Sequence, residues 1–206
     1  NEKINISETE KKIGSINCIY RKKNKFYGIN TDGIAGYNSI RKFGEITNKK
    51  ILLLGCGGTG KSIAANISEN LNNKKNLIIA VRSPEKILEF SENIEAKTIS
   101  WSDISEYIDD ADIIINATTI GNLNDLDNSP LSEKQIKKIK KNKIFFDINY
   151  QPIKTKFLQN AEENNHIILN GSFMNLQQAV IAFDICNGIN KEISNTFEHM
   201  NNIANV

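Results

Sequence analysis

The sequence predicts an α/β fold built around a doubly wound parallel sheet. Short apolar runs alternate with helical patterns six times between residues 50 and 171. Each run is apolar at nearly every position, which is typical of strands that are buried on both faces. This alternation implies parallel strands joined by right-handed crossovers, with helices on both sides of the sheet.

Before this sheet, the chain is expected to form a short strand over residues 16–20 and a basic turn over 21–25. A glycine-rich, irregular stretch then passes into a helix over residues 34–43. Gly44 follows that helix as its stop signal.

The sheet is expected to begin with the apolar run at residues 50–55, which ends in glycines. Some of the helices between the strands have clear starts: Ser83 and Pro84 form an N-cap and first-turn pair, and Ser102 opens a short helix. We therefore expect six strands, over residues 50–55, 76–81, 96–101, 111–118, 143–149 and 166–171. Helices are expected between them over residues 59–70, 83–93, 102–108, 132–141 and 155–164. Two further helices, over residues 174–188 and 192–204, are expected after the last strand.

The composition argues against several classes of partner. The chain has 206 residues, of which 39% are apolar, enough for one large domain or two small ones. Its 26 basic and 24 acidic side chains leave a net charge of +2, so no nucleic-acid partner is expected. The run of lysines between residues 137 and 143 is interpreted as a solvated helix face. No apolar run approaches the ~18 residues that span a bilayer, and no signal peptide is visible.

Cysteine and histidine usage points to a reducing, cytoplasmic location and to no metal. Three cysteines, spread far apart in the sequence, fit inert packing roles better than a disulfide framework. His166 and His199 have no metal-like partners in the sequence and are interpreted as surface or capping residues.

Residues 51–64, ILLLGCGGTGKSIA, fit two nucleotide-binding patterns that both begin at Gly55. One is G-x-x-x-x-G-K-S, the phosphate loop of ATPases and GTPases, in which Lys61 and Ser62 would hold phosphate and Mg²⁺. The other is G-x-G-x-x-G, the turn that holds a dinucleotide pyrophosphate. Both use backbone N–H groups and a helix N-terminus to bind anionic oxygens.

The tip of the second strand favours the dinucleotide. In that fold the tip meets the adenosine ribose, and an acidic residue there binds the 2′-hydroxyl of NAD. Here the tip reads AVRSPEK, so Arg82, Ser83 and Lys86 stand near the ribose. A guanidinium binds phosphate oxygens with two parallel charge-assisted bonds, which suits the 2′-phosphate of NADP. The sequence therefore favours a Rossmann-type domain that binds NADP, with Lys61 and Ser62 as exposed residues of a first helical turn.

Seven collinear segments resemble shikimate dehydrogenases and their quinate-using relatives. Any one match is weak, but seven in the same order make a strong signal. The segments are IGSINCI (13–19), GINTDGIAG (28–36), GCGGTGKSIA (55–64), VRS (81–83), INATTIGN (115–122), DINYQPIKTKFLQNA (147–161) and NGSFMNLQQAVIAF (170–183).

The resemblance implies a role for each matched residue. Asp32 would be half of the family's catalytic Lys–Asp pair and would also bind a substrate hydroxyl. Asn17, Tyr150 and Gln178 would complete the substrate contacts. The implied cofactor residues fall into three groups. The pyrophosphate would be held by Gly55, Gly57, Gly58 and Thr59, and the 2′-phosphate by Arg82, Ser83 and Lys86. The ribose and nicotinamide would be lined by Thr118, Thr119, Gly121 and Met174.

The implied reaction is the NADP-dependent, reversible reduction of 3-dehydroshikimate to shikimate, a step toward aromatic amino acids. It needs hydride at carbon and a proton at oxygen, and a Lys ammonium can donate that proton and stabilise the developing alkoxide. In the family this Lys comes from a substrate domain upstream of the first matched segment, and Lys3, Lys11 and Lys12 lack its motif. The chain is therefore expected to bind NADP(H), as a monomer or homodimer, but to catalyse poorly or not at all.

The same resemblance divides the chain into four parts. Residues 1–33 would be a remnant of the substrate-binding domain, 34–47 a connecting helix, 48–171 the NADP-binding domain, and 172–206 helices that pack back towards the substrate domain.

Several alternatives stay open at this point. The chain is either an enzyme or a non-catalytic NADP-binding or regulatory module that has lost its substrate domain, and a P-loop NTPase is a third reading. Asn122 and Asn175 replace the family's Met and Leu, so quinate or a related cyclic hydroxy acid remains a possible substrate. From spacing alone, Asp32 could be a helix N-cap, Asn116 a backbone-bonding residue and Tyr150 a packing residue.

Overall fold

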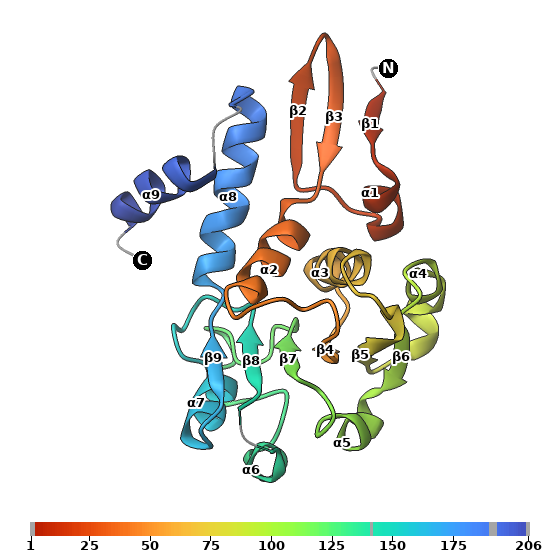
Figure 1. Ribbon diagram of the computed structural model, residues 1–206, viewed down its shortest axis with the longest axis vertical. Coiled ribbons are helices and arrows are strands. Elements are labelled where there is room, and N and C mark those ends of the chain that lie inside the picture. The colour runs from red at the N-terminus through yellow and green to blue at the C-terminus, as the bar shows by residue number, and fades with distance from the viewer. Residues whose placement is uncertain (1–2, 141, 190–192, 205–206) are drawn as a thin grey trace.

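Two sheets with helices between them make up the molecule (Figure 1). The computed structural model describes residues 3–140, 142–189 and 193–204. Residues 1–2, 141, 190–192 and 205–206 therefore lie outside the described residues, among them the first residues of the expected segment 1–33 and Lys141 of the lysine run. No helix within the described part of the chain combines the length and apolar character needed to cross a bilayer.

The larger sheet has six parallel strands in the order β6-β5-β4-β7-β8-β9. Counted from its own first strand, this is the order 3-2-1-4-5-6 of the Rossmann fold, which confirms the predicted fold class. Every strand falls inside its predicted range. Their bounds are β4 Ile51–Leu54, β5 Leu77–Val81, β6 Lys97–Ser100, β7 Ile113–Asn116, β8 Ile144–Asp147 and β9 Ile167–Leu169.

Helices cover both faces of this sheet. Alternate strand residues enter two separate cores: Ile51 and Leu53 pack toward α2, α3 and α8, whereas Leu52 and Leu54 pack toward α5, α6 and α7. The crossover helices are α3 Gly58–Glu69, α4 Leu88–Asn93, α5 Ile104–Tyr107, α6 Glu133–Lys138 and α7 Lys156–Glu163. The predicted helix at residues 83–93 is shorter than expected, because Pro84–Ile87 form a 3₁₀ turn before α4.

A small three-stranded sheet precedes the larger one. It consists of β1 Ile4–Ile6, β2 Cys18–Lys22 and β3 Lys25–Ile29 in the order β1-β3-β2, with α1 Glu8–Ile13 after its first strand. The expected basic turn over residues 21–25 is present but narrower than predicted. Only Lys23 and Asn24 turn the chain, both with positive φ, and the flanking residues pair as an antiparallel hairpin.

Two further helices lie between or beside the two sheets, α2 Thr31–Arg41 and α8 Ser172–Asn187, and α9 Ile193–Ala204 packs against α8. In Figure 1, α2 and α3 lie between the two sheets and α8 runs beside them. The α2 helix packs against both α3 and α8. Gly171 precedes α8, and a Cβ there would lie 2.0 Å from the carbonyl oxygen of Ile148, so the start of α8 is held directly against the end of β8.

Two expected environments are wrong. His166 is only 6% exposed rather than on the surface, because it stands just before β9 and its ring packs 4.8 Å from that of Phe145 in β8. Cys186, expected to pack inside, is exposed on the last turn of α8.

Candidate functional site

The glycine turn after β4 leaves open space over a helix N-terminus. Gly55 has φ +92°, and Gly60 packs so closely on it that an added Cβ would lie 2.9 Å from the Gly55 carbonyl oxygen. A Cβ at Gly57 or Gly58, in contrast, would meet nothing within 4 Å. Unpaired N–H groups and the helix dipole at the start of α3 therefore face a space that suits an anion.

Ser62 departs from its predicted position. Its side chain is fully buried rather than exposed, and its hydroxyl donates a hydrogen bond to Asn30 Oδ1 at 2.8 Å. The reason is that α2 crosses α3 at close range: a Cβ on Gly33 would lie 2.4 Å from the Ser62 carbonyl oxygen. A hydroxyl committed to this helix contact is poorly placed to bind Mg²⁺, which argues against the phosphate-loop reading.

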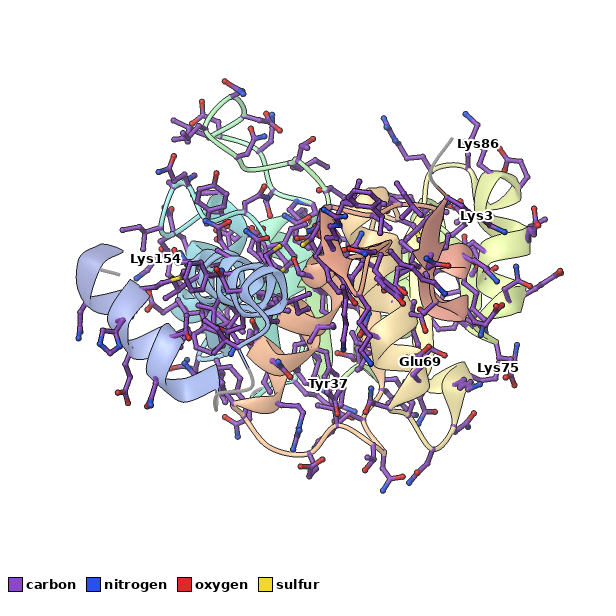
Figure 2. The ribbon with its side chains drawn as sticks, turned by 90° about the horizontal axis from the view of Figure 1, so that it is seen from above. Lys3, Tyr37, Glu69, Lys75, Lys86 and Lys154 are labelled. Atoms are coloured by element: carbon purple, nitrogen blue, oxygen red, sulfur yellow. The ribbon has the colours of Figure 1, made fainter. Side chains whose placement is uncertain are left out.

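The cationic strand tip lies at the same edge as the glycine turn. Gly55 N donates to the Ala80 carbonyl oxygen at 2.9 Å, so the residues that follow β5 emerge beside that turn. Arg82 and Lys86 are exposed and Ser83 is half-buried. Lys86 projects outward at the periphery of the molecule (Figure 2). An exposed guanidinium and ammonium beside an open helix N-terminus fit a ligand with two separate phosphate groups.

A cavity of about 200 Å³ brings together predicted residues from both halves of the chain. Ile148, Gly171 and Asn175, to which the sequence assigned no specific ligand contact, also line it. The predicted residues that it unites are Asp32, Thr59, Tyr150, Met174 and Gln178.

The Asp32 carboxylate lies at the centre of this cavity's polar contacts. Asn17 Nδ2 donates to its Oδ1 at 3.0 Å, and the Thr59 hydroxyl donates to its Oδ2 at 3.3 Å. Burial raises the pKa of Asp32, and these two hydrogen bonds oppose the rise. The N-cap alternative for Asp32 is wrong, because Asn30 caps α2 by accepting from Asp32 N at 3.1 Å. The carboxylate is thus free to accept a hydrogen bond from a ligand.

The turn after β7 is fixed by Asn116, which is fully buried. Its amide nitrogen donates to the Ile120 carbonyl oxygen at 3.0 Å, and its amide oxygen accepts from the Thr118 hydroxyl at 2.6 Å. Thr118 is therefore engaged within the turn, whereas Thr119 is exposed. Gly121 has φ +90°, a conformation that favours glycine.

A second cavity, of about 280 Å³, lies next to the first and shares Ile148 and Tyr150 with it. Tyr150 is 48% exposed, so it is a surface residue between two cavities and not a packing residue. Asn122 lines the second cavity and Asn175 the first, which places both departures from the family pattern at the candidate site.

Sequence reasoning missed two residues that hold the site together, Asn30 and Thr31. Asn17 Oδ1 accepts from Thr31 N at 2.9 Å, and the Thr31 hydroxyl lies 3.3 Å from Gln178 Oε1. Together with Asn30, these side chains link the small sheet, α2, α3 and α8. The run Asn-Thr-Asp before a helix is a capping signal, but the sequence does not show which of the three caps and which faces a ligand.

None of the described residues that line the first cavity is a lysine. All three candidate lysines are exposed: Lys3 precedes β1, and Lys11 and Lys12 lie on α1, where Lys11 pairs with Glu8. Within the described part of the chain, the arrangement supplies a carboxylate, amides and hydroxyls to a small polar ligand, but no ammonium group that lines the cavity.

Comparison with known proteins connects this geometry to a family. The family model described as Shikimate / quinate 5-dehydrogenase matches residues 39–162. A shikimate dehydrogenase (NADP(+)) of Clostridium botulinum is 35% identical over 182 residues, which are 86% of this chain and 67% of that protein.

Solved structures agree with this family match. A chorismate mutase/shikimate 5-dehydrogenase fusion protein from Clostridium acetobutylicum is 29% identical, with a TM-score of 0.80 over 98% of this chain and 72% of that one. A shikimate dehydrogenase in complex with NADP⁺ is 27% identical, with a TM-score of 0.79 over 97% of this chain and 70% of that one.

The chain spans 67% of the length of the curated relative, and the family match covers well over half of the chain itself. The glycine turn, the cationic strand tip and the Asp32 cavity all lie within the part that aligns with solved relatives. The chain belongs to the shikimate and quinate dehydrogenase family.

Proposed function

We propose that this chain forms the NADP side and part of the substrate site of a shikimate dehydrogenase. The reaction is the reversible, NADP-dependent reduction of 3-dehydroshikimate to shikimate. One observation carries the proposal: Asp32, at the start of α2, accepts a hydrogen bond from Thr59, in the first turn of α3 after the glycine turn. A residue implied to bind substrate thus touches a residue implied to bind cofactor, as hydride transfer between two ligands requires.

The residues present fit the cofactor. NADPH, when bound, supplies the hydride. Gly57 and Gly58 offer the uncovered N-terminus of α3 to the pyrophosphate, where any side chain would intrude. Arg82, with Ser83 and Lys86, holds the 2′-phosphate through charge-assisted hydrogen bonds. Met174 lines the Asp32 cavity and offers an apolar surface to the nicotinamide.

Substrate recognition rests on the groups around Asp32. Its carboxylate accepts a hydrogen bond from a substrate hydroxyl, and Asn17 and Thr59 fix its orientation. Gln178 and Tyr150 line the same cavity and offer an amide and a phenol to the other hydroxyls of a cyclic polyol acid. This set of neutral donors and acceptors with one carboxylate favours a polyhydroxylated ligand over an apolar one.

A second function is favoured by one specific observation, the lack of a lysine among the described residues that line the Asp32 cavity. A chain that binds NADP and shikimate without a proton donor would be a non-catalytic NADP-binding or regulatory module. The two functions differ in turnover and not in cofactor binding, so cofactor binding and turnover need separate measurements.

Cofactor choice is tested by titrating NADPH and NADH against the chain and following nicotinamide fluorescence. NADPH should bind more tightly than NADH. Arg82→Ala should weaken NADPH binding about 10- to 100-fold and leave NADH binding unchanged, because the guanidinium that is removed contacts only the 2′-phosphate, which NADH lacks. The control is Lys75→Ala, since Lys75 is an exposed cation that precedes β5 at the opposite end of the strand. In Figure 2, Lys86 lies near the upper edge of the molecule and Lys75 near the lower edge. Tighter binding of NADH by the native chain would contradict this assignment.

Substrate choice is tested in the presence of NADP⁺ by adding shikimate or quinate and measuring the melting temperature. Shikimate should raise it, and Asp32→Asn should remove most of that rise without changing NADPH affinity. NADPH formation at saturating shikimate then separates the two functions. Measurable turnover supports the dehydrogenase, binding without turnover supports the module, and the absence of any shikimate or quinate effect removes both substrates.

A further inference from the structure

Two cysteines that are distant in sequence lie against each other beside the small sheet. Cys18 is the first residue of β2 and is buried, and Cys186 is exposed on the last turn of α8. Their Sγ atoms are 3.7 Å apart and share a hydrogen bond. A disulfide bond measures about 2.05 Å, so the two atoms need to approach by about 1.7 Å, within reach of side-chain rotation.

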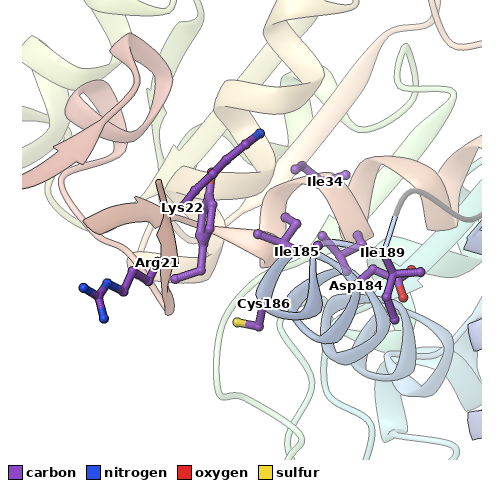
Figure 3. A pocket seen from close by; sticks show the side chains of 10 residues that line it. Arg21, Lys22, Ile34, Asp184, Ile185, Cys186 and Ile189 are labelled. Carbon is purple, nitrogen blue, oxygen red and sulfur yellow. The ribbon is translucent and has the colours of Figure 1, made fainter. Parts of the chain in front are cut away.

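The surroundings of Cys186 admit a small anionic reagent. A cavity of about 600 Å³ lies between β2 and α8, and Cys186 lines it together with Arg21 and Lys22 (Figure 3). The Cys186 sulfur points from α8 toward the strand that carries those two cations. Asp184 is the one acidic residue among the described lining residues, so the two cations outnumber it. An anionic thiol compound that enters this space finds positive charge for its carboxylates and an exposed sulfur to react with.

We propose that Cys18 and Cys186 are a reversible redox modification site, in which a small anionic disulfide of the glutathione type oxidises the pair to an intramolecular disulfide. Cys186 is the attacking thiol because it is exposed, and Cys18 is the resolving thiol behind it. The proposal does not depend on the dehydrogenase function.

The exchange balances in two steps. The Cys186 thiolate attacks one sulfur of glutathione disulfide, which forms a mixed disulfide and releases one glutathione thiolate. The Cys18 thiolate then attacks the Cys186 sulfur, which forms the intramolecular bond and releases the second glutathione. Two cysteine thiols are oxidised, one glutathione disulfide is reduced, and the two cysteine protons end on the two glutathiones. Burial raises the pKa of Cys18 to about 11, which suits a thiol that reacts only after the exposed one has been modified.

The bond would join two segments that meet at the Asp32 cavity. Cys18 directly follows Asn17, which donates to Asp32, and α8 carries Gln178, which lines the same cavity. The two cysteines are separated by 168 positions, so their cross-link would remove much of the conformational freedom of the unfolded chain. Oxidation therefore links the small sheet to α8 and stabilises the arrangement around the site.

The test treats the native chain with glutathione disulfide, alkylates the remaining thiols and maps peptides by mass spectrometry without reduction. The expected result is a Cys18–Cys186 cross-linked peptide, an alkylated Cys56 and an intact mass lower by about 2 Da before alkylation. The melting temperature should rise by about 5–15 °C and return to its starting value with dithiothreitol.

Three variants make the test specific. Cys186→Ser should give neither cross-link nor melting shift, and Cys18→Ala should retain glutathione on Cys186 as a stable adduct. Cys186→Ser combined with Asn187→Cys moves the exposed thiol by one position and should take up glutathione without forming a cross-link. The proposal is overturned if the native chain keeps a glutathione adduct with Cys18 still free, if its melting temperature does not change, or if the displaced thiol cross-links equally well.

Discussion

At the scale of single residues, Asp147 organises the loops beside the site although it does not line either cavity. Its carboxylate is fully buried at the end of β8. Oδ1 accepts from the amide of Asn116 at 3.1 Å and from the backbone N–H of Asn149 at 3.0 Å, and Oδ2 accepts from the Thr155 hydroxyl at 2.7 Å. Burial raises the pKa of Asp147, and these hydrogen bonds oppose the rise. The carboxylate thus ties the β7 turn, the β8 loop and the start of α7 together.

Asp147→Asn should destabilise the fold by about 1–3 kcal/mol, because an amide presents a donor where the native group accepts and leaves a buried partner unsatisfied. Urea unfolding of both proteins measures the difference. The matched control, Asp109→Asn at an exposed position, should change stability by less than about 0.5 kcal/mol. Equal effects of the two substitutions would mean that the hydrogen bonds of Asp147 contribute nothing to the free energy of unfolding.

At the scale of elements, the contact between α2 and α3 sets the position of Asp32. Gly33 permits that contact, since a Cβ there would lie 2.2 Å from Asn66 Nδ2 as well as against Ser62. Gly58 lies at the start of the same α3 but faces open space. Two glycines on neighbouring helices therefore serve different purposes, one in packing and one toward the proposed cofactor.

Gly33→Ala and Gly58→Ala should have opposite effects. Gly33→Ala forces the helices apart and should cost about 1–3 kcal/mol of stability, measured by urea unfolding. Gly58→Ala should leave stability unchanged or raise it by up to about 1 kcal/mol, but should weaken NADPH binding at least 10-fold, because the methyl group occupies the approach to the α3 N-terminus. A stable Gly33→Ala protein would show that α2 and α3 are not packed as described.

The start of β9 carries a pH-sensitive element. Burial lowers the pKa of His166 below its ordinary 6.5, so the folded protein holds the ring neutral. Below pH 6.5 the unfolded chain takes up a proton that the folded chain resists, so stability falls as the pH drops from 6.5 through the lowered pKa and is unaffected above 6.5.

His166→Leu should remove this dependence, which has a limiting slope of about 1.4 kcal/mol per pH unit. Unfolding free energies measured by urea between pH 5 and 8 give the slope. His199→Leu is the control, because His199 is exposed on α9 and its replacement should leave the slope intact. An unchanged slope in His166→Leu would assign the acid sensitivity to other groups.

At the scale of the whole molecule, the large sheet was predictable, whereas only one strand of the small sheet was: the strand expected over residues 16–20 overlaps β2. Strands buried on both faces leave continuous apolar runs such as Ile51–Leu54, which stand out in any sequence. The β1 strand is exposed at all three positions, so it leaves no such run. The hairpin of β2 and β3 turns at Lys23 and Asn24 without the Asn-Gly signal of tight hairpins. Gly28 also suggested an irregular chain, yet it lies in β3 because Ile16 packs over it.

The same limit applies to the candidate site. Motif resemblance located Asp32, Thr59 and Gln178, and the structure places all three around one cavity. It could not find contacts created by helix crossing, such as the hydrogen bond from Ser62 to Asn30. Such contacts depend on interhelical distance, which the pattern of a single segment does not encode.

The α8 helix is anchored at one end by Gly171, which leaves its other end with the longest lever arm. Its 16 residues extend about 24 Å, and the tight approach of Gly171 to β8 fixes one end. A swing of about 5° about that end displaces the distal tip by about 2 Å while hardly moving the first turn, where Met174 and Asn175 lie. A tether at Cys186, one residue before the C-terminal end of α8, would therefore restrain such a swing much more effectively than a bond near Met174.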